Sequence, residues 1–367
     1  MKILIAANPA SNHTFRWVKS LCDKNIDVVL FGFNSFDARL YQGINNLKIY
    51  SSGASQSLYK SENKARKILY LFAYRKLKKI IKIEKPDILH SHYASSYGFV
   101  SALTGFKPLI VSVWGSDIYV FPRSSFVAKK IIKYTLNRAT RIFSTSYDMA
   151  RETKLYIDKN IDVTPFGVDV VKFKNSGKRL FFDSNHIVIG TIKNLEKNSG
   201  IDYLIKAFSI LKIKYNDRCL KLVITGDGNE KHNLKKLCSN LNLNKDVIFT
   251  GYVNQNNIVD FFSSFDIYVA PSLIESFGVA VLEASACEIP VVCTNAGGLP
   301  EVVINEQTGL IVPKADEVKL SEAIGKLVKD EKLRKTMGQN ARKFVEDKYN
   351  WVDTVNNVVK LYNKILY

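Results

Sequence analysis

The stretch from Asp266 to Ala286 constrains the fold of this chain more than any other. Its first seven residues, ending in Pro271-Ser272, are typical of a buried strand that closes in a turn. Its last eight are small and apolar apart from Glu283, as in a helix packed on a sheet. The turn between them would lie at the carboxyl end of a parallel strand, where open α/β sheets bind ligands. Amides around Phe277-Gly278-Val279 would then lie at a helix N-terminus and could donate to a phosphate.

Two carboxylates of this stretch have an informative spacing. Glu283 follows Glu275 by eight positions, which is two helical turns or about 12 Å at about 1.5 Å per residue. A nucleoside diphosphate sugar has a comparable reach from its hexose to its ribose, so one acid could hold sugar hydroxyls and the other ribose hydroxyls. The alternative is that Glu275 caps a helix and Glu283 is paired in an ordinary core, since a buried Glu is costly without a donor.

The spacing E-x7-E after a Pro-Ser strand end resembles the signature of the retaining nucleotide-sugar glycosyltransferases of family 4, which have the GT-B fold. The resemblance implies an α/β protein with two Rossmann-like domains that face a central cleft. We expect an acceptor-binding domain over residues 1–171 and a donor-binding domain over 186–350, with a linker over 172–185. The final helix, 351–367, is expected to pack back on the first domain.

Length and composition agree with this organisation. A chain of 367 residues suits two domains of about 150–200 residues each. No run of eighteen apolar residues predicts a membrane-spanning helix, and the apolar run Met1–Ala7 is too short for a signal peptide and predicts a first strand. The five cysteines are widely spaced without a C-x-x-C pair. Neither a disulfide framework nor a zinc site is therefore indicated, and a reducing, cytoplasmic setting fits.

The positive charge is concentrated in the first half of the chain. Residues 1–180 hold 30 Lys and Arg against 12 Asp and Glu, whereas residues 181–367 hold 23 against 22. Two segments, 60–85 and 123–141, combine basic with apolar residues at helical spacing. Each alone is compatible with a solvated helix face. Together they favour contact with an anionic membrane surface. The other anionic partner to consider is nucleic acid, and no nucleic-acid-binding motif supports it.

Four residues of the first half are predicted to line the cleft on the acceptor side. His13 begins the helix after the first strand, where a surface histidine is an equally good interpretation. Residues 86–93 resemble the family's PD-x-x-H-x-H strand and place His92 at the cleft edge. Trp114 stands where many family members have a histidine, and an indole can stack on a sugar but cannot accept a proton. Asp117 is expected to cap the following helix, with a contact to acceptor or sugar as the alternative.

The turn after the strand at 187–192 departs from the family pattern. Many members have an arginine and a lysine there that neutralise the donor diphosphate, and this chain has Asn194 and Ser199 at those positions. A leaving diphosphate needs electrostatic stabilisation. We therefore assign Lys193 as the main cation and keep Lys197 as the alternative, while a solvent-facing loop lysine is a competing interpretation of Lys193 itself.

Glycine turns complete the predicted donor site. By resemblance, the loop at Gly226 borders the nucleotide, the backbone at Val253 reads the base, and Gly297-Gly298 lets backbone approach the phosphates. One such turn would indicate only a tight connection, but five in the family's order and spacing between Gly190 and Pro313 form a strong signal. No cluster of metal ligands is seen, so no metal is expected. With Glu275 as the catalytic residue, the predicted donor-binding residues are Lys193, Asn194, Gly226, Val253, Ser276, Phe277, Gly278, Val279, Glu283, Gly297 and Gly298.

The resemblance implies transfer of a hexosyl or N-acetylhexosaminyl unit from a nucleotide sugar, with UDP favoured, and with retention of configuration. The expected acceptor is a membrane-associated, polyprenyl-diphosphate-linked saccharide at the inner face of the cell membrane, in capsule or lipopolysaccharide assembly. No cofactor beyond the donor is expected, and no general base is assigned. Two alternatives stay open: a nucleotide-sugar epimerase of related fold, and a non-catalytic glycosyltransferase-like subunit, which the departures at Trp114, Asn194 and Ser199 would explain.

Overall fold

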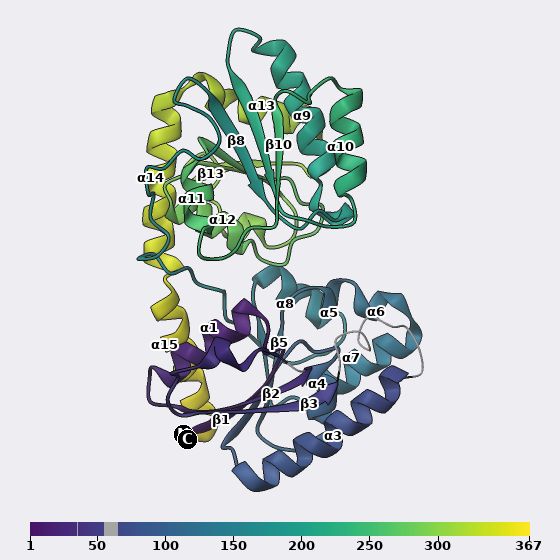
Figure 1. Cartoon of the computed structure of the whole chain (residues 1–367). Helices are drawn as coiled ribbons and strands as arrows, with labels where there is room; N and C mark the ends of the chain where they lie inside the picture. Colours follow the sequence, from purple (N-terminus) through teal and green to yellow (C-terminus); the bar gives the residue numbers. More distant parts are fainter. Residues whose placement is uncertain (35, 55–64) are drawn as a thin grey trace. The chain divides into compact units, whose positions relative to one another are not determined.

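The computed structural model describes residues 1–34, 36–54 and 65–367, without the side chains of residues 54 and 65–71. The chain forms two compact units (Figure 1). Unit 1 consists of Met1–Thr164 and Val355–Tyr367, and unit 2 of Pro165–Thr354. Each unit contains a parallel sheet covered by helices, which confirms the predicted α/β fold class with two Rossmann-like sheets.

Unit 1 is built on a seven-stranded parallel sheet in the order β3-β2-β1-β4-β5-β6-β7. The inner strands are buried at nearly every position, as expected for strands covered on both faces. The strand order reverses between β1 and β4, and such a switch point opens a crevice at the carboxyl ends of the strands. The strands are β1 (Lys2–Ala6), β2 (Asp27–Asn34), β3 (Leu47–Ala54), β4 (Ile88–His92), β5 (Leu109–Val113), β6 (Arg141–Ser144) and β7 (Ile161–Val163).

Helices connect the strands of unit 1 and cover its sheet (Figure 1). The basic helix expected over 60–85 is observed as α3 (Ala65–Glu84), and residues 60–64 lie outside the described part of the chain. Ala73, Leu77 and Ile80 recur at helical spacing and are buried in the core. The other helices are α1 (Asn12–Cys22), α4 (Tyr97–Thr104), α5 (Ser116–Tyr119), α6 (Phe121–Ser124), α7 (Phe126–Arg138), α8 (Tyr147–Lys154) and the 3-10 helix η1 (Ala38–Tyr41).

The last helix, α15 (Trp351–Leu366), belongs to unit 1 from Val355 onward. Its Tyr362 is buried, and the phenol oxygen lies 2.6 Å from Nδ1 of His90 on β4. The other ring nitrogen of His90, Nε2, lies 2.7 Å from the hydroxyl of Ser112 on β5. Two strands and the end of the chain are therefore joined through one histidine.

Unit 2 contains a six-stranded parallel sheet in the order β10-β9-β8-β11-β12-β13. Its strand order reverses between β8 and β11, which gives this unit its own switch point. The strands are β8 (Ile187–Ile192), β9 (Leu220–Thr225), β10 (Val247–Gly251), β11 (Ile267–Ala270), β12 (Val291–Thr294) and β13 (Gly309–Val312).

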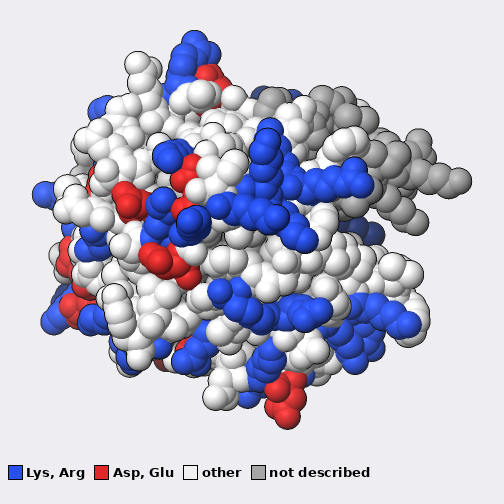
Figure 2. All heavy atoms as spheres, turned by 90° about the horizontal axis from the view of Figure 1, so that it is seen from below, with Lys and Arg blue, Asp and Glu red and all other residues white. Residues whose placement is uncertain are grey.

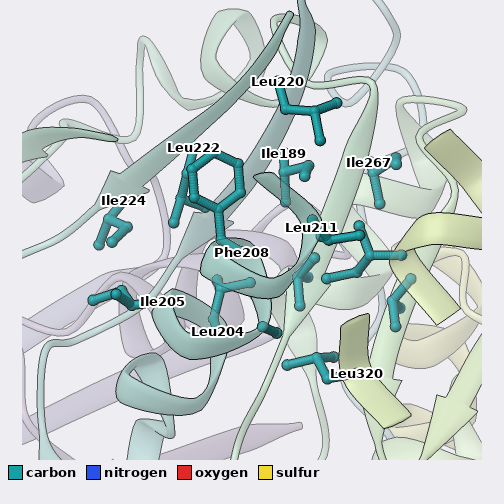
Figure 3. Packing of buried hydrophobic residues seen from close by; sticks show 14 of the residues in the cluster. Ile189, Leu204, Ile205, Phe208, Leu211, Leu220, Leu222, Ile224, Ile267 and Leu320 are labelled. Atoms are coloured by element: carbon teal, nitrogen blue, oxygen red, sulfur yellow. The ribbon is translucent and has the colours of Figure 1, made fainter. Parts of the chain in front are cut away.

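The core of unit 2 lies between its sheet and helix α9 (Ile201–Lys214). Figure 3 shows Leu204, Phe208 and Leu211 of α9 directed at apolar side chains of β8 and β9, among them Ile189 and Leu222. Burial of these residues positions the carboxyl ends of the strands. The other helices are η2 (Lys197–Ser199), α10 (Lys231–Asn240), α11 (Ile258–Ser263), α12 (Val279–Ala286), η3 (Leu299–Glu301), α13 (Glu317–Lys329) and α14 (Glu331–Lys348).

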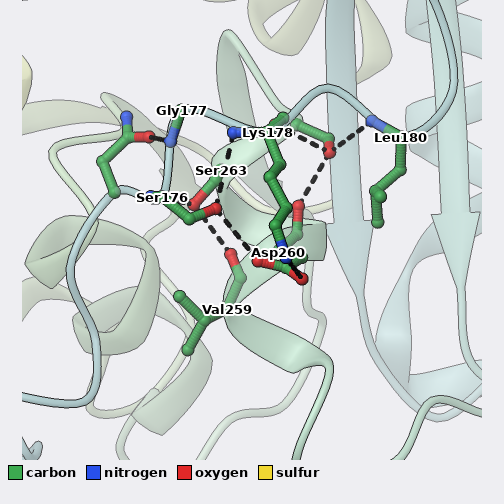
Figure 4. A network of polar contacts seen from close by, with 9 residues as sticks. Ser176, Gly177, Lys178, Leu180, Val259, Asp260 and Ser263 are labelled. Carbon is green, nitrogen blue, oxygen red and sulfur yellow. Dashed lines mark hydrogen bonds and ion pairs between the residues drawn. The ribbon is translucent and has the colours of Figure 1, made fainter.

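The segment 172–185, predicted to be a linker, belongs to unit 2 and is bonded to helix α11 and the residue after it. The amide of Ser176 donates to Ser263 Oγ over 2.9 Å, and Lys178 Nζ pairs with Asp260 Oδ2 at 2.8 Å (Figure 4). The amide of Leu180 donates to Ser264 Oγ over 2.9 Å. Three successive anchors thus fix this segment on the second unit.

Candidate functional site

Lys193 and Glu275 meet at the switch point of unit 2. Lys193 directly follows β8, and Glu275 lies in the turn after the neighbouring strand β11. Lys193 Nζ forms an ion pair with Glu275 Oε2, and the two side chains are only 16% and 19% exposed. The amide of Ser276 donates to the other carboxylate oxygen over 3.1 Å. The structure thus joins the residue predicted to act on the sugar with the one predicted to neutralise the diphosphate.

The turn between Glu275 and α12 is held from two sides. Phe277 is buried, and its ring packs edge-on against Phe166 and Tyr349. Gly278 is the N-cap of α12 with φ +111°, and an added Cβ would lie 2.8 Å from Leu299 Cδ2. The first backbone bonds of the helix, from the amides of residues 281 and 282, end on the carbonyl of Gly278. Val279 therefore begins the helix, as predicted, and its amide precedes the helical ladder.

One predicted phosphate donor is already occupied. The amide of Gly298 donates to the carbonyl oxygen of Glu275 over 3.1 Å. This bond fixes the loop that carries Glu275, and a role of Gly297-Gly298 toward the phosphates stays a prediction. Gly297, with φ +52°, adopts the left-handed conformation that allows the turn.

Glu275 and Glu283 both affect the pKa of Tyr268 on β11, a residue that the sequence did not single out. Glu283 is 8% exposed on α12. Burial is the main cause of the raised pKa of Tyr268, and the carboxylates of Glu275 and Glu283 add to it. The phenol donates to the carbonyl of Ile192 over 3.3 Å. The one feature of the sequence that could have pointed to Tyr268 is its hydroxyl in the otherwise apolar strand β11.

Close backbone contacts fix the loop that carries Lys193. An added Cβ on Gly226 would collide with the carbonyl of Lys193, and one on Gly200 with the carbonyl of Pro271. The amide of Lys193 donates to Thr225 over 2.9 Å, and the amide of Gly226 to Gly251 over 2.9 Å. These glycines allow three loops at the carboxyl edge of the sheet to touch through their backbones.

The remaining predicted donor residues have simpler surroundings. Ser199, at the family's lysine position, donates its hydroxyl to the carbonyl of Asn194 over 2.6 Å and so closes the turn. The side chain of Asn194 is exposed, and Lys197 is exposed on η2. Val253 is half-buried just after β10. In the described part of the chain, no group of three or more His, Cys, Asp or Glu side chains could hold a metal ion.

In unit 1, three of the four residues predicted for the acceptor side come together at the β1/β4 switch point. The ring of Trp114, just after β5, lies 4.3 Å from that of His92 at the end of β4. The ring of His13 on α1 also lies near that of Trp114, with a centroid distance of 6.1 Å. Burial, followed by the charge of Arg16, lowers the pKa of His13. Burial also lowers the pKa of His92 well below its usual range, with His90 and His13 adding to the effect.

Asp117 fixes the backbone beside this cluster through hydrogen bonds. It is completely buried and accepts the amides of Ala94 at 2.8 Å, Gly115 at 2.9 Å and Trp114 at 3.2 Å. The expectation that it caps the following helix is wrong, because its oxygens bind the backbone that precedes it and the N-cap of α5 is Gly115. Burial raises the pKa of Asp117, against the effect of these amides. Its role is to fix the loop that carries Trp114.

Comparison with known proteins shows the family of the chain. The model "Glycosyl transferases group 1" matches residues 172–344, and "Glycosyl transferase 4-like" matches residues 2–146. An uncharacterised glycosyltransferase of Methanocaldococcus jannaschii is 31% identical over 307 residues, which is 82% of each chain. The chain belongs to the group 1 glycosyltransferases.

Two further comparisons agree with this glycosyltransferase assignment. The capsular polysaccharide biosynthesis glycosyltransferase CapM of Staphylococcus aureus is 31% identical over 248 residues, covering 66% of this chain and 63% of CapM. The structure of Anabaena HepE in complex with UDP-glucose matches 99% of this chain and 100% of that chain with a TM-score of 0.81 at 17% identity. The structural match confirms the GT-B fold. The glycosyltransferase is accordingly a nucleotide-sugar-dependent enzyme of a family that retains anomeric configuration.

Proposed function

We propose that this glycosyltransferase transfers a sugar from a UDP-sugar to a lipid-linked saccharide in surface-polysaccharide assembly. The observation that carries the donor half is the Lys193–Glu275 pair at the switch point of unit 2, beside the N-terminus of α12. Support for UDP comes from HepE, whose structure is a complex with UDP-glucose, and support for a polysaccharide comes from the name of CapM.

In this proposal Glu275 orients the donor sugar through its hydroxyls, and Glu283 accepts the ribose hydroxyls. Lys193 and the amides of Phe277, Gly278 and Val279 hold the diphosphate. Without donor, Glu275 and Lys193 neutralise each other. When the donor binds, Lys193 turns to the phosphate, and Glu275 accepts from sugar hydroxyls in its place. A positive group near the leaving phosphate matters most as charge develops there in the transition state.

Donor binding is the direct test. We expect UDP-sugars to raise the melting temperature of the full chain in proportion to their affinity, with smaller shifts for GDP- and ADP-sugars. Slow release of UDP without acceptor should accompany binding. Glu306→Gln, a change at an exposed acid that forms its ion pair with Lys326, should leave both unchanged. No nucleotide binding by calorimetry would instead support a non-catalytic subunit, and release of an epimerised nucleotide sugar would support an epimerase.

The lipid-linked acceptor is proposed from the surface of unit 1. Figure 2 shows a face on which Lys and Arg side chains gather with few Asp and Glu between them. Helix α4 contacts both α3 and α7. α7 begins with Phe126 and Val127, which are 71% and 65% exposed, and α3 carries Phe72 at 60%. The exposed lysines on the described parts of the same two helices are Lys76, Lys78, Lys79, Lys82, Lys129, Lys130 and Lys133.

Exposed apolar side chains next to lysines are suited to an anionic bilayer surface. Each basic residue near such a surface contributes about 1 kcal/mol, and an inserted Phe or Val adds about 1.5–3 kcal/mol if fully buried. No helix among the described residues is long and apolar enough to cross a membrane. The contact that we propose is a peripheral one, through the exposed side chains of α3 and α7.

Flotation with anionic liposomes checks this proposal. We expect the protein to float at low salt and to do so less at moderate salt, because screening weakens the lysine term. The double change Phe126→Ser and Val127→Ser should reduce the partition coefficient by about tenfold or more. Val171→Ser is the matched control, since Val171 is 87% exposed in unit 2. Protein that stays at the bottom of the gradient at both salt concentrations would contradict membrane contact.

A further inference from the structure

The amino end of α1 in unit 1 has the properties of an anion site. The N-cap residue, Ser11, makes no side-chain cap, and the first turn contains no acid. The first backbone bond of the helix runs from the amide of Phe15 to the carbonyl of Ser11, so the three preceding amides have no place in the helical ladder. These amides and the helix dipole favour a negative group at this end of an eleven-residue helix.

Two buried polar atoms beside this turn lack a partner among the described residues. The hydroxyl of Thr14, in the first turn itself, is unbonded there although the residue is only 1% exposed. Nδ1 of His92, which is 3% exposed, is the other such atom. A buried polar atom without a hydrogen bond costs about 1–3 kcal/mol, and most such atoms in proteins are satisfied. Two of them next to one helix N-terminus therefore indicate a polar ligand.

A positive side chain and two histidine rings lie near these atoms. Arg16 lies further along α1, and its charge lowers the pKa of His13. His13 in turn acts on His92, so the two rings and the arginine lie within one electrostatic neighbourhood. Asp117, an acid near Trp114, accepts hydrogen bonds from three backbone amides. Burial lowers the pKa of both imidazoles and so favours their neutral form, in which each ring can donate one N–H.

We propose that the N-terminal turn of α1, with Thr14, Arg16 and His92, binds an oxyanion of the acceptor: a phosphate or a carboxylate. The indole of Trp114 forms the wall beside this site, where it can stack on the sugar that carries the group. The inference rests on the proposed function in one respect, namely that unit 1 receives the acceptor. It deepens that function by giving the acceptor a charged group close to its reacting sugar.

Trp114 also supplies the measurement. The chain contains three tryptophans, so fluorotryptophan labelling of the full chain gives three 19F resonances, and Trp114→Phe identifies that of Trp114. Titration with potassium phosphate should shift this resonance saturably, whereas potassium chloride at equal ionic strength should not. A parallel titration with potassium acetate distinguishes a carboxylate from a phosphate.

Variants decide whether the site is the one described. Arg16→Gln should weaken phosphate binding by about tenfold, the effect of one charge-assisted hydrogen bond. Thr14→Val should also weaken it, and it should leave the melting temperature equal or higher because an unbonded buried hydroxyl is removed. Lys24→Gln, which removes a positive charge from an exposed position just after α1, should bind phosphate like the unchanged protein. Thr14→Val keeps the test informative if Arg16→Gln does not fold.

Three results would overturn the inference. The first is the absence of a saturable shift with both phosphate and acetate. The second is unchanged phosphate affinity in Arg16→Gln and Thr14→Val. The third is displacement of phosphate from this site by UDP at equal concentration, which would assign the oxyanion to the donor. The thermal shift with UDP-sugars is measured on the same samples, so failure of the donor proposal is recognised separately.

Discussion

Glu275→Gln and Lys193→Met are each expected to lower donor turnover by about a hundred- to a thousand-fold, the loss found when one transition-state stabilising group is removed. The glutamine keeps the size of Glu275 but not its charge, and the methionine keeps the stem of Lys193 without its cation. Each change also leaves a largely buried partner charge unpaired, which is destabilising by itself. The measurement is the rate of UDP release at saturating donor, with the melting temperature as the check on folding.

The double variant and a neighbouring lysine sharpen this test. Because the two residues are in contact, the losses in the double variant should be less than the product of the single losses. Lys197→Met is the matched control, since Lys197 is exposed on η2 four positions further along. A large loss in Lys197→Met with little change in Lys193→Met would move the diphosphate role to Lys197 and contradict our assignment.

The second large effect is expected in Gly200→Ala, which should destabilise unit 2 by about 2–6 kcal/mol. A left-handed backbone conformation in a residue with a side chain costs about 1–3 kcal/mol, and forcing atoms into a packed site costs about 1–3 kcal/mol more. Gly200 has φ +67°, and its added methyl would collide with the carbonyl of Pro271. That residue leads into the loop of Glu275, so donor affinity should fall as well. Urea unfolding and the UDP-sugar thermal shift measure the two effects.

Gly177→Ala provides a close control for this change. Gly177 has φ +70° in the same unit, and an added Cβ there would meet no atom of the described residues within 4 Å. Its substitution should therefore show the conformational cost alone, about 1–3 kcal/mol, with unchanged donor affinity. Equal destabilisation by the two substitutions would mean that the contact with Pro271 is unimportant.

The features that depend on neighbouring residues were the ones best predicted from the sequence. The strand, turn and helix at 266–286 are observed as β11, the turn and α12, because apolar patterning and glycine placement are local signals. The glycine turn at Gly226 directly follows β9, as expected for a loop at the carboxyl edge of the sheet. The role of each residue toward a donor remains a prediction, which the experiments above address.

Contacts between distant segments were beyond the reach of local patterns. No local pattern pairs Lys193 with Glu275, because 82 positions separate them and only the order of β8 and β11 brings them together. The bond from the amide of Gly298 to the carbonyl of Glu275 could not be predicted either, because it joins the backbones of two separate loops. Asp117 was misassigned because the sequence position does not tell in which direction the carboxylate points.

The hydrogen bond between Tyr362 and His90 affects how the protein folds during its synthesis. Residues 1–164 leave the ribosome first, but the helix that completes their core is synthesised almost two hundred residues later. Domains usually fold in the order in which they are translated. Here the earlier unit must wait, with part of its apolar surface uncovered, while the later unit can finish first. Nascent chains stalled before residue 355 should accordingly need chaperone protection for their first half rather than their second.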